Sequence, residues 1–214
     1  MSGTIVRTDG WDAYVTKGNS GLGIVVIHEI YGLTNYVKSV ADALSAAGHS
    51  AAAVDYFKGK IAKTLEEGFA LRASVKKEDI VSATQAGFKS LRSAGAKKVG
   101  TLGFCMGGGY ALQAACSIKD AAFCVDYYGM IENAEEAANL NGPVLLILAS
   151  EDTRINPWAT SSFLPSAISH KKRVEVELYP NAMHAFHNNT GPNYNEAAAK
   201  DAWQRTIEFL SRVK

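Results

Sequence analysis

Continuous apolar runs alternate along the chain with stretches of helical periodicity. An uninterrupted run of five to eight apolar residues is typical of a strand buried on both faces of a parallel sheet. Such runs predict strands over residues 21–28, 50–55, 99–104, 121–127 and 144–149. Apolar residues spaced three and four apart predict helices over residues 34–47, 79–91, 108–116, 158–168 and 196–213. Strands separated by helix-length segments indicate right-handed βαβ units in a mostly parallel, twisted sheet with helices on both faces.

Weaker patterns flank this alternation. Residues 4–7 and 13–16 alternate between apolar and polar positions and predict an edge hairpin, and residues 173–179 predict an alternating strand. Residues 57–75 keep helical spacing but are broken by Gly59 and Gly68, which makes them a candidate lid. We found no repeat, low-complexity tract or linker, so we expect one α/β domain over residues 1–214.

Composition narrows the class of protein. The 214 residues carry 22 Lys and Arg against 21 Asp and Glu, which gives no reason to expect a nucleic acid or an anionic membrane as partner. The N-terminus lacks the apolar core of a signal peptide, and no apolar run approaches the roughly 20 residues needed to span a bilayer. Three cysteines without a paired spacing suit a reducing compartment, so a cytoplasmic protein is expected.

The chemistry centres on Gly103-Phe104-Cys105-Met106-Gly107, between a predicted strand and a predicted helix. A nucleophile with glycines two residues away on each side is typical of a sharp strand-to-helix turn. Cys105 would stand at its tip, with the Met106 N–H as one oxyanion donor. Two alternatives remain open at this point, because cysteine is often a buried core residue and glycine-rich turns also occur in nucleotide-binding folds. Cys116 and Cys124 lie among small apolar residues and are expected in the core.

Partners for this nucleophile follow two later strands. Asp152 comes directly after the strand at 144–149, and His184 lies five residues after the strand at 173–179. The order nucleophile, acid, histidine is that of the α/β-hydrolases. Asp152 could instead cap the helix that follows it, with Glu151 as a rival acid, and His184 could be a surface residue.

A loop after the first buried strand reads His28-Glu29-Ile30-Tyr31-Gly32. In α/β-hydrolases this loop supplies the second oxyanion N–H, for which Ile30 is the candidate. Glu29 would then be a carboxylate at the mouth of the site. It could equally be an acid that the dipole of the following helix favours.

Together the segments HEIYG, GFCMGG, SEDTRINP and NAMHAFHN resemble the dienelactone hydrolases, small cysteine enzymes with the α/β-hydrolase fold and no large cap domain. The resemblance runs from Gly21 to the C-terminus. It implies a Cys105-His184-Asp152 triad that opens a small lactone or cleaves an activated ester through an acyl-thioester, without a cofactor. It also implies that Glu29 hydrogen-bonds the resting thiol and takes its proton when substrate binds.

The chain departs from this family where the substrate carboxylate is held. The family has an arginine four residues after the triad histidine, and here that position is Asn188. Arg72 and Arg154 are the remaining candidates for an anion clamp, although either could be a solvated or structural residue. Aromatic residues could line a more apolar pocket or pack in the core; they are Trp158, Tyr31, Tyr36, Phe57 and Phe186.

Two functions of other classes remain as alternatives. Loss of the arginine is compatible with a protein that binds small molecules with little turnover, and Cys105 alone is compatible with a redox-sensing thiol. A metal site is not expected, because His184 and His187 have no carboxylate or cysteine at ligand spacing. The expected partner is a small lactone or ester, and the chain is expected to be a monomer or a weak homodimer.

Overall fold

Eight strands form one sheet in the computed structural model, which describes residues 3–213. Their order across the sheet is β1-β2-β4-β3-β5-β6-β7-β8. β1 and β2 form an antiparallel hairpin at one edge, β2 pairs antiparallel with β4, and all further pairs are parallel. The strands are β1 Thr4–Thr8, β2 Trp11–Thr16, β3 Leu22–Ile27, β4 Ser50–Val54, β5 Lys98–Phe104, β6 Ala121–Tyr127, β7 Val144–Ala149 and β8 Val174–Tyr179.

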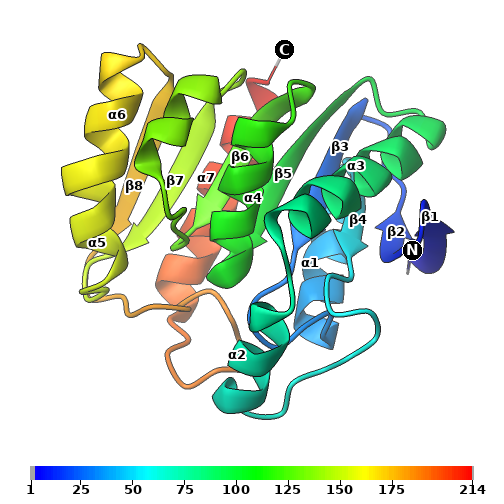
Figure 1. The fold of residues 1–214 in the computed structure, drawn as a ribbon, viewed down its shortest axis with the longest axis horizontal. Helices are drawn as coiled ribbons and strands as arrows, with labels where there is room; N and C mark the ends of the chain where they lie inside the picture. Colours follow the sequence, from blue (N-terminus) through cyan, green and yellow to red (C-terminus); the bar gives the residue numbers. More distant parts are fainter. Residues whose placement is uncertain (1–2, 214) are drawn as a thin grey trace.

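Helices cover both faces of this sheet (Figure 1). α3, α4, α5 and α6 lie on the near face in this view, and α1 and α7 lie behind the strands. The helices are α1 Asn35–Ala46, α2 Leu65–Ala73, α3 Lys77–Ser93, α4 Met106–Ser117, α5 Ile155–Trp158, α6 Leu164–Ser169 and α7 Glu196–Ser211. A π-helical segment, Ala159–Phe163, joins α5 to α6, and a 3₁₀ helix occupies Ala134–Asn139.

The central strands divide the core into two layers. All six residues of β3 are buried. Val25 and Ile27 belong to the cluster under α3 and α4, whereas Ile24 and Val26 belong to the cluster under α1 and α7. Successive side chains of a strand point to opposite faces, so a strand that is apolar throughout must be covered twice. The apolar run predicted this arrangement correctly, and the fold class is the one expected.

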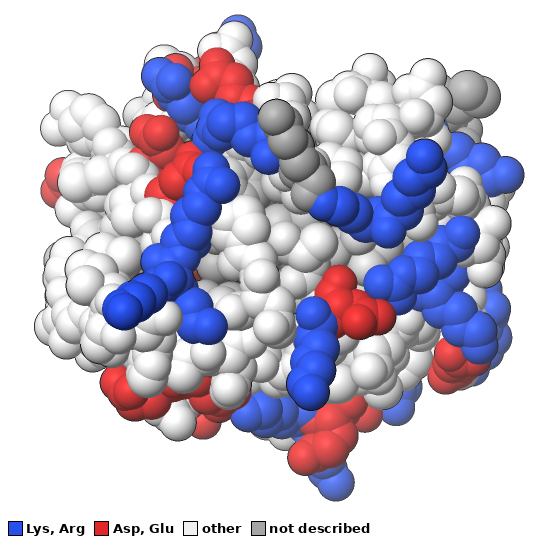
Figure 2. Space-filling model, turned by 90° about the horizontal axis from the view of Figure 1, so that it is seen from above, with Lys and Arg blue, Asp and Glu red and all other residues white. Residues whose placement is uncertain are grey.

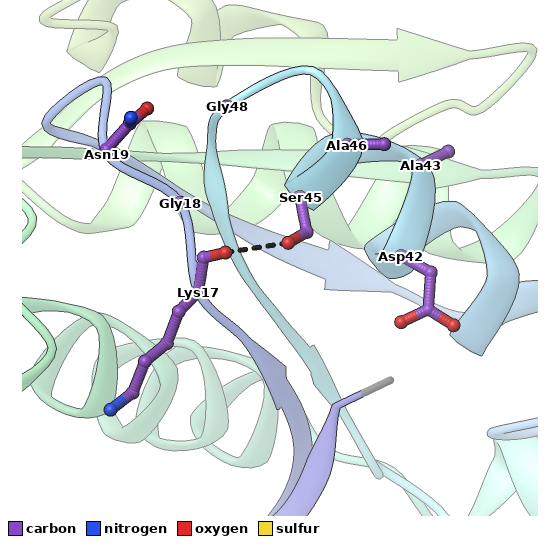
Figure 3. Close-up of a pocket in the computed structure, with 8 residues that line it drawn as sticks. All are labelled: Lys17, Gly18, Asn19, Asp42, Ala43, Ser45, Ala46 and Gly48. Carbon is purple, nitrogen blue, oxygen red and sulfur yellow. Dashed lines mark hydrogen bonds between the residues drawn. The ribbon is translucent and has the colours of Figure 1, made fainter. Parts of the chain in front are cut away.

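The two ends of the parallel strands differ in what surrounds them. At the carboxyl end, the lower edge in Figure 1, α2 lies next to the N-terminal end of α4. At the other end, Lys and Arg side chains are spread among acidic and neutral surface (Figure 2). A hollow of about 940 Å³ also lies there, between residues 17–19 and the last turns of α1, where Ser45 Oγ donates to the Lys17 carbonyl (Figure 3). This hollow is at the opposite end of the sheet from Cys105.

Several boundaries differ from those predicted. The strands predicted over 121–127 and 144–149 have those bounds, and the edge hairpin is present. The helix predicted to begin at 158 begins at Ile155, and α4 begins at Met106 rather than at 108. The 3₁₀ helix lies in a segment rich in Glu and Asn where the sequence predicted no helix, because its one buried residue gives no periodic signal.

No helix among residues 3–213 is long and apolar enough to cross a membrane. Nor does this part of the chain contain a group of three or more His, Cys, Asp or Glu side chains placed to hold a metal ion.

Candidate active site

Cys105 stands on a strained turn between β5 and α4. Its backbone has φ 56° and ψ −120°, a combination that residues other than glycine rarely adopt. The flanking glycines make this turn possible, since a Cβ on Gly103 would lie 1.9 Å from the Gly107 carbonyl oxygen. A Cβ on Gly107 would lie 2.2 Å from the Ile27 carbonyl oxygen. The turn therefore places Cys105, which is only partly buried, at the carboxyl end of the sheet.

His184 reaches the thiol from the loop after β8. Its Nε2 lies 2.9 Å from Cys105 Sγ, although 79 residues separate the two along the chain. The His184 side chain is 37% exposed, so the pair can be reached from solvent. A nucleophile in hydrogen-bonding contact with an imidazole is the arrangement needed for nucleophilic catalysis.

Asp152 holds the other side of the imidazole. Its Oδ2 lies 2.6 Å from His184 Nδ1, and its Oδ1 accepts the backbone N–H groups of Arg154 and Ile155 at 3.1 and 3.0 Å. The sequence left open whether Asp152 caps the following helix or contacts the histidine. The buried carboxylate does both, since Oδ1 accepts the backbone N–H groups at the start of that helix and Oδ2 contacts His184. Glu151, the rival acid, is exposed and accepts the Ser150 hydroxyl.

The groups in contact with His184 favour the protonated form of its ring. Burial lowers the pKa of His184, but the hydrogen bonds to Asp152 and Cys105 and the attraction of their charges outweigh burial and raise it to about 10. Burial raises the pKa of Asp152, yet the hydrogen bonds from His184 and from the backbone bring it below its usual value. An imidazolium next to a sulfur atom stabilises the thiolate, which is the nucleophilic form of cysteine.

His28, a fully buried residue, fixes the conformation of the loop after β3 through two hydrogen bonds. The Tyr56 N–H donates to His28 Nε2 at 3.2 Å, so Nδ1 must carry the ring hydrogen and donate to the Glu29 carbonyl oxygen at 2.7 Å. Because the peptide unit is planar and trans, the Ile30 N–H points away from that carbonyl group. Within the described residues this N–H has no hydrogen-bond acceptor, so it is available to a ligand.

Glu29 is buried at the same site. Its Oε1 accepts a hydrogen bond from Asn188 Nδ2 at 2.7 Å, so its partner here is an amide rather than the Cys105 thiol. Burial raises the pKa of Glu29 to about 7, while the Asn188 hydrogen bond and the charge of His184 act in the opposite direction. Asn188 occupies the position of the missing arginine, and its amide faces a protein carboxyl group.

The two arginine candidates lie apart from the thiol contacts. Arg72 lines a hollow of about 400 Å³ with Tyr110 and Met130, between α2 and α4. The Arg154 side chain is exposed at the start of α5, and only its backbone N–H reaches Asp152.

The aromatic candidates lie mostly in the core, which was the alternative interpretation. Phe186 is fully buried, 5.5 Å from the Tyr128 ring centroid, so it offers no surface to a ligand. Trp158 is 9% exposed and stacks on Phe163. Tyr31 is only partly buried and lies beside Ile30 in the loop after β3.

Sequence reasoning missed three residues at this site. His28 contacts the backbone of Glu29 and Tyr56, and Thr190 donates from its N–H and its hydroxyl to Asn188 Oδ1. No local sequence pattern indicates either set of contacts. Tyr128, directly after β6, has φ 45°, and its buried ring centroid lies 5.1 Å from that of His184. Its hydroxyl has no partner in the part of the chain described. The Tyr-Tyr-Gly segment that ends a buried strand was the available signal.

The sheet order, the strained turn at Cys105, and Asp152 and His184 after later strands define the α/β-hydrolase fold. A family model for the "Dienelactone hydrolase family" matches residues 11–214, and the chain belongs to this family. Like the other members of that family, it is a hydrolase.

Individual relatives agree with this assignment. The chain is 29% identical to a protein of Saccharolobus solfataricus named "Putative carboxymethylenebutenolidase", with 92% of each covered. It is 28% identical to a Bradyrhizobium protein named "Probable 2-oxo-3-(5-oxofuran-2-ylidene)propanoate lactonase", covering 87% of this chain and 82% of that one. A solved structure from Klebsiella pneumoniae, titled as a putative dienelactone hydrolase, has a TM-score of 0.85 at 22% identity, covering 98% and 97% of the two chains.

Proposed function

We propose that the chain hydrolyses small lactones or activated esters through an acyl-thioester on Cys105. The observation that carries this proposal is the continuous chain of contacts from Cys105 Sγ through the His184 ring to Asp152, at 2.9 and 2.6 Å. The names of the relatives, which refer to butenolides and an oxofuran lactone, support the substrate class.

The first half of the reaction forms the thioester. The Cys105 thiol first turns from His184 towards Glu29, whose carboxylate accepts the thiol proton. The resulting thiolate then pairs with the His184 imidazolium. The thiolate attacks the carbonyl carbon, and the oxyanion receives hydrogen bonds from the Met106 and Ile30 N–H groups. The bond to the leaving oxygen then breaks, and this oxygen takes the proton from His184 Nε2. In a lactone the leaving oxygen stays attached to the acyl group.

The second half releases the acid. Neutral His184 takes a proton from water, and the hydroxide adds to the thioester carbonyl. Collapse of this adduct breaks the carbon–sulfur bond and frees the carboxylic acid, the thiolate and the imidazolium. The thiolate then recovers its proton from Glu29. Asp152 keeps the imidazole in the required orientation through both halves.

A panel of aryl esters and dienelactones tests this mechanism. Cys105→Ala and His184→Ala should each lower kcat/KM by about 10³-fold or more. Cys116→Ala and His170→Ala are matched controls, because Cys116 is buried in the core and His170 is at the surface. Mass spectrometry of the quenched wild type should detect an acyl adduct on the Cys105 peptide. Turnover by Cys105→Ala at the wild-type rate would exclude the proposal.

The same experiment addresses the two alternative functions. Multiple turnovers would exclude a binding protein. A redox sensor with an internal resolving thiol is disfavoured by the burial of Cys116 and Cys124, which raises the pKa of both thiols.

The pH profile gives an independent test. Glu29 must be ionised and His184 protonated at the start of the cycle. The profile of kcat/KM should therefore rise through about pH 7 and fall through about pH 10. Glu29→Gln should lower the plateau and remove the acidic limb.

A further inference from the structure

The buried carboxyl group of Glu29 is held by a side chain from the loop that carries His184. Glu29 is 4% exposed and Asn188 is 5% exposed, and their contact of 2.7 Å joins positions 159 residues apart. A buried carboxyl group requires a hydrogen-bond donor to be stable in its ionised form. The contact therefore provides Glu29 with a donor that its own loop lacks.

Thr190 determines which end of the Asn188 amide faces Glu29. The Thr190 N–H and hydroxyl both meet the same amide atom, at 2.9 and 2.7 Å. A backbone N–H can only donate, so this atom is Oδ1, and the amide nitrogen must face Glu29. The orientation of the donor is thus fixed by two contacts rather than one.

The backbone around Asn188 is equally constrained. The Asn188 N–H donates to the Ala185 carbonyl, and the Asn188 carbonyl accepts the Gly191 N–H, both at 3.1 Å. Ala185 directly follows His184. One short turn therefore holds the histidine in contact with the thiol and the amide in contact with Glu29.

We infer that Asn188, oriented by Thr190, is a positioning residue that fixes Glu29 and sustains its ionised form for proton transfer. This inference rests on the proposed function, in which Glu29 accepts the thiol proton. The titratable groups that face Glu29 are His184, Tyr36 and Tyr128. Of these, only His184 carries a charge at neutral pH. The Asn188 amide is therefore the main uncharged donor that opposes the effect of burial.

Two substitutions separate positioning from substrate binding. Asn188→Leu keeps the volume and removes the donor. It should move the acidic limb of kcat/KM about one pH unit higher and lower kcat at pH 7 about fivefold, with KM within twofold. Thr190→Val removes one of the two contacts that orient the amide, and should move the limb in the same direction by a smaller amount. Thr190→Ser keeps both contacts and should restore the limb. Asn189→Leu, at the exposed neighbouring position, is the matched control.

A readout without turnover keeps the test independent of the mechanism. Carbon-13 NMR of side-chain-labelled glutamate, assigned by Glu29→Gln, should detect a higher pKa of Glu29 in Asn188→Leu and in Thr190→Val. Thr190 is at the surface, so Thr190→Val remains informative if Asn188→Leu does not fold.

The outcomes distinguish the two proposals. Turnover by Cys105→Ala would overturn the proposed function, yet the NMR titration would still decide whether Asn188 controls Glu29. If Cys105→Ala is inactive and neither Asn188→Leu nor Thr190→Val moves the acidic limb or the Glu29 titration, the inference alone is overturned. A rise in KM without a change in the limb would also overturn it, because Asn188 would then be a contact for the substrate.

Discussion

The two ends of the parallel strands are built from different kinds of residue. At the carboxyl end, Cys105 and the buried Tyr128 both have positive φ, and the carboxyl groups of Glu29 and Asp126 are buried with raised pKa values. At the amino end, glycines take the positive φ angles of the turns that precede β4 and β5, while Lys171 takes that of the turn before β8. Ionic contacts at this end, such as that of Arg92, are exposed. Strain and buried acids therefore concentrate where the thiol is.

This difference indicates that the rest of the fold fixes the carboxyl end in a conformation that its own residues would not favour. Strained backbone and buried ionisable groups lower stability, and they persist only where the surrounding structure fixes them. Paired substitutions at the two ends should reveal this in activity and in the free energy of unfolding.

The largest effect is expected for Asp152→Asn. An amide at this position would leave the His184 ring without its anionic partner and favour the wrong tautomer, so kcat/KM should fall about 10³–10⁴-fold. Glu151→Gln, at the exposed neighbour, should change kcat/KM less than twofold. Steady-state kinetics on an aryl ester measure both, and equal losses in the two variants would contradict the role of Asp152.

Replacing a glycine by alanine should lower the free energy of unfolding more at the carboxyl end of the strands than at the amino end. In Gly107→Ala the new Cβ would overlap the backbone of Ile27, and we expect a loss of about 3 kcal/mol in the free energy of unfolding together with loss of activity. In Gly48→Ala the nearest contact is 3.4 Å away, so only the positive φ opposes the change, at about 1–2 kcal/mol. Urea denaturation compares the two variants. A larger loss in Gly48→Ala would contradict the comparison.

Asp126 should make stability depend on pH. Burial raises the pKa of Asp126 to about 7, and Oδ2 has no hydrogen-bond partner among residues 3–213. The folded state binds this proton more tightly than the unfolded state, so the contribution of Asp126 to stability is most favourable at low pH and falls between about pH 4 and pH 7. Asp126→Asn should therefore be more stable than wild type at pH 9, by about 2 kcal/mol, and not at pH 4.

Urea denaturation at the two pH values measures this effect. Asp120→Asn, which alters an exposed carboxyl group, is the control. A pH-independent difference between Asp126→Asn and the wild type would exclude ionisation as its cause.

The smallest effect is expected for Arg92→Ala at the amino end. The Arg92 contact with Asp120 is 3.3 Å long, and both side chains are exposed. Exposed ion pairs stabilise proteins by about 0–1 kcal/mol and are screened by salt. Arg92→Ala should therefore change the free energy of unfolding by less than about 0.5 kcal/mol. Thermal denaturation in low and high salt would detect a larger contribution.

The fold could be predicted because its signals are local. Buried strands such as β6 and β7 read as uninterrupted apolar runs, and their bounds in the structure are those predicted. The short 3₁₀ helix after β6 has one buried residue and could not be recognised. Exact helix starts also escaped prediction, since α4 begins at Met106 directly after the strained Cys105.

The candidate site likewise contains residues that the sequence predicted and a contact that it could not predict. Cys105, Asp152 and His184 were expected to converge because each follows a strand, and in the structure their side chains are in contact. The hydrogen bond between Glu29 and Asn188 depends on the fold of a whole loop, and no spacing in the sequence encodes it. The thiol, the acid and the histidine could be predicted from their residue types and their places after strands, whereas Tyr128 after β6 and the contact between Glu29 and Asn188 could not.

The attachment of α2 has an evolutionary consequence. Gly68 is the one buried residue of this helix, and it is seated against Ile30, while Leu65 and Phe69 are more than half exposed. Substitutions on its outer face would change an exposed apolar surface beside the N-terminal end of α4 without disturbing the sheet. We therefore expect that substitutions in this helix can change the substrate preference with little loss in the free energy of unfolding. This makes α2 the first segment to vary in directed evolution of the enzyme.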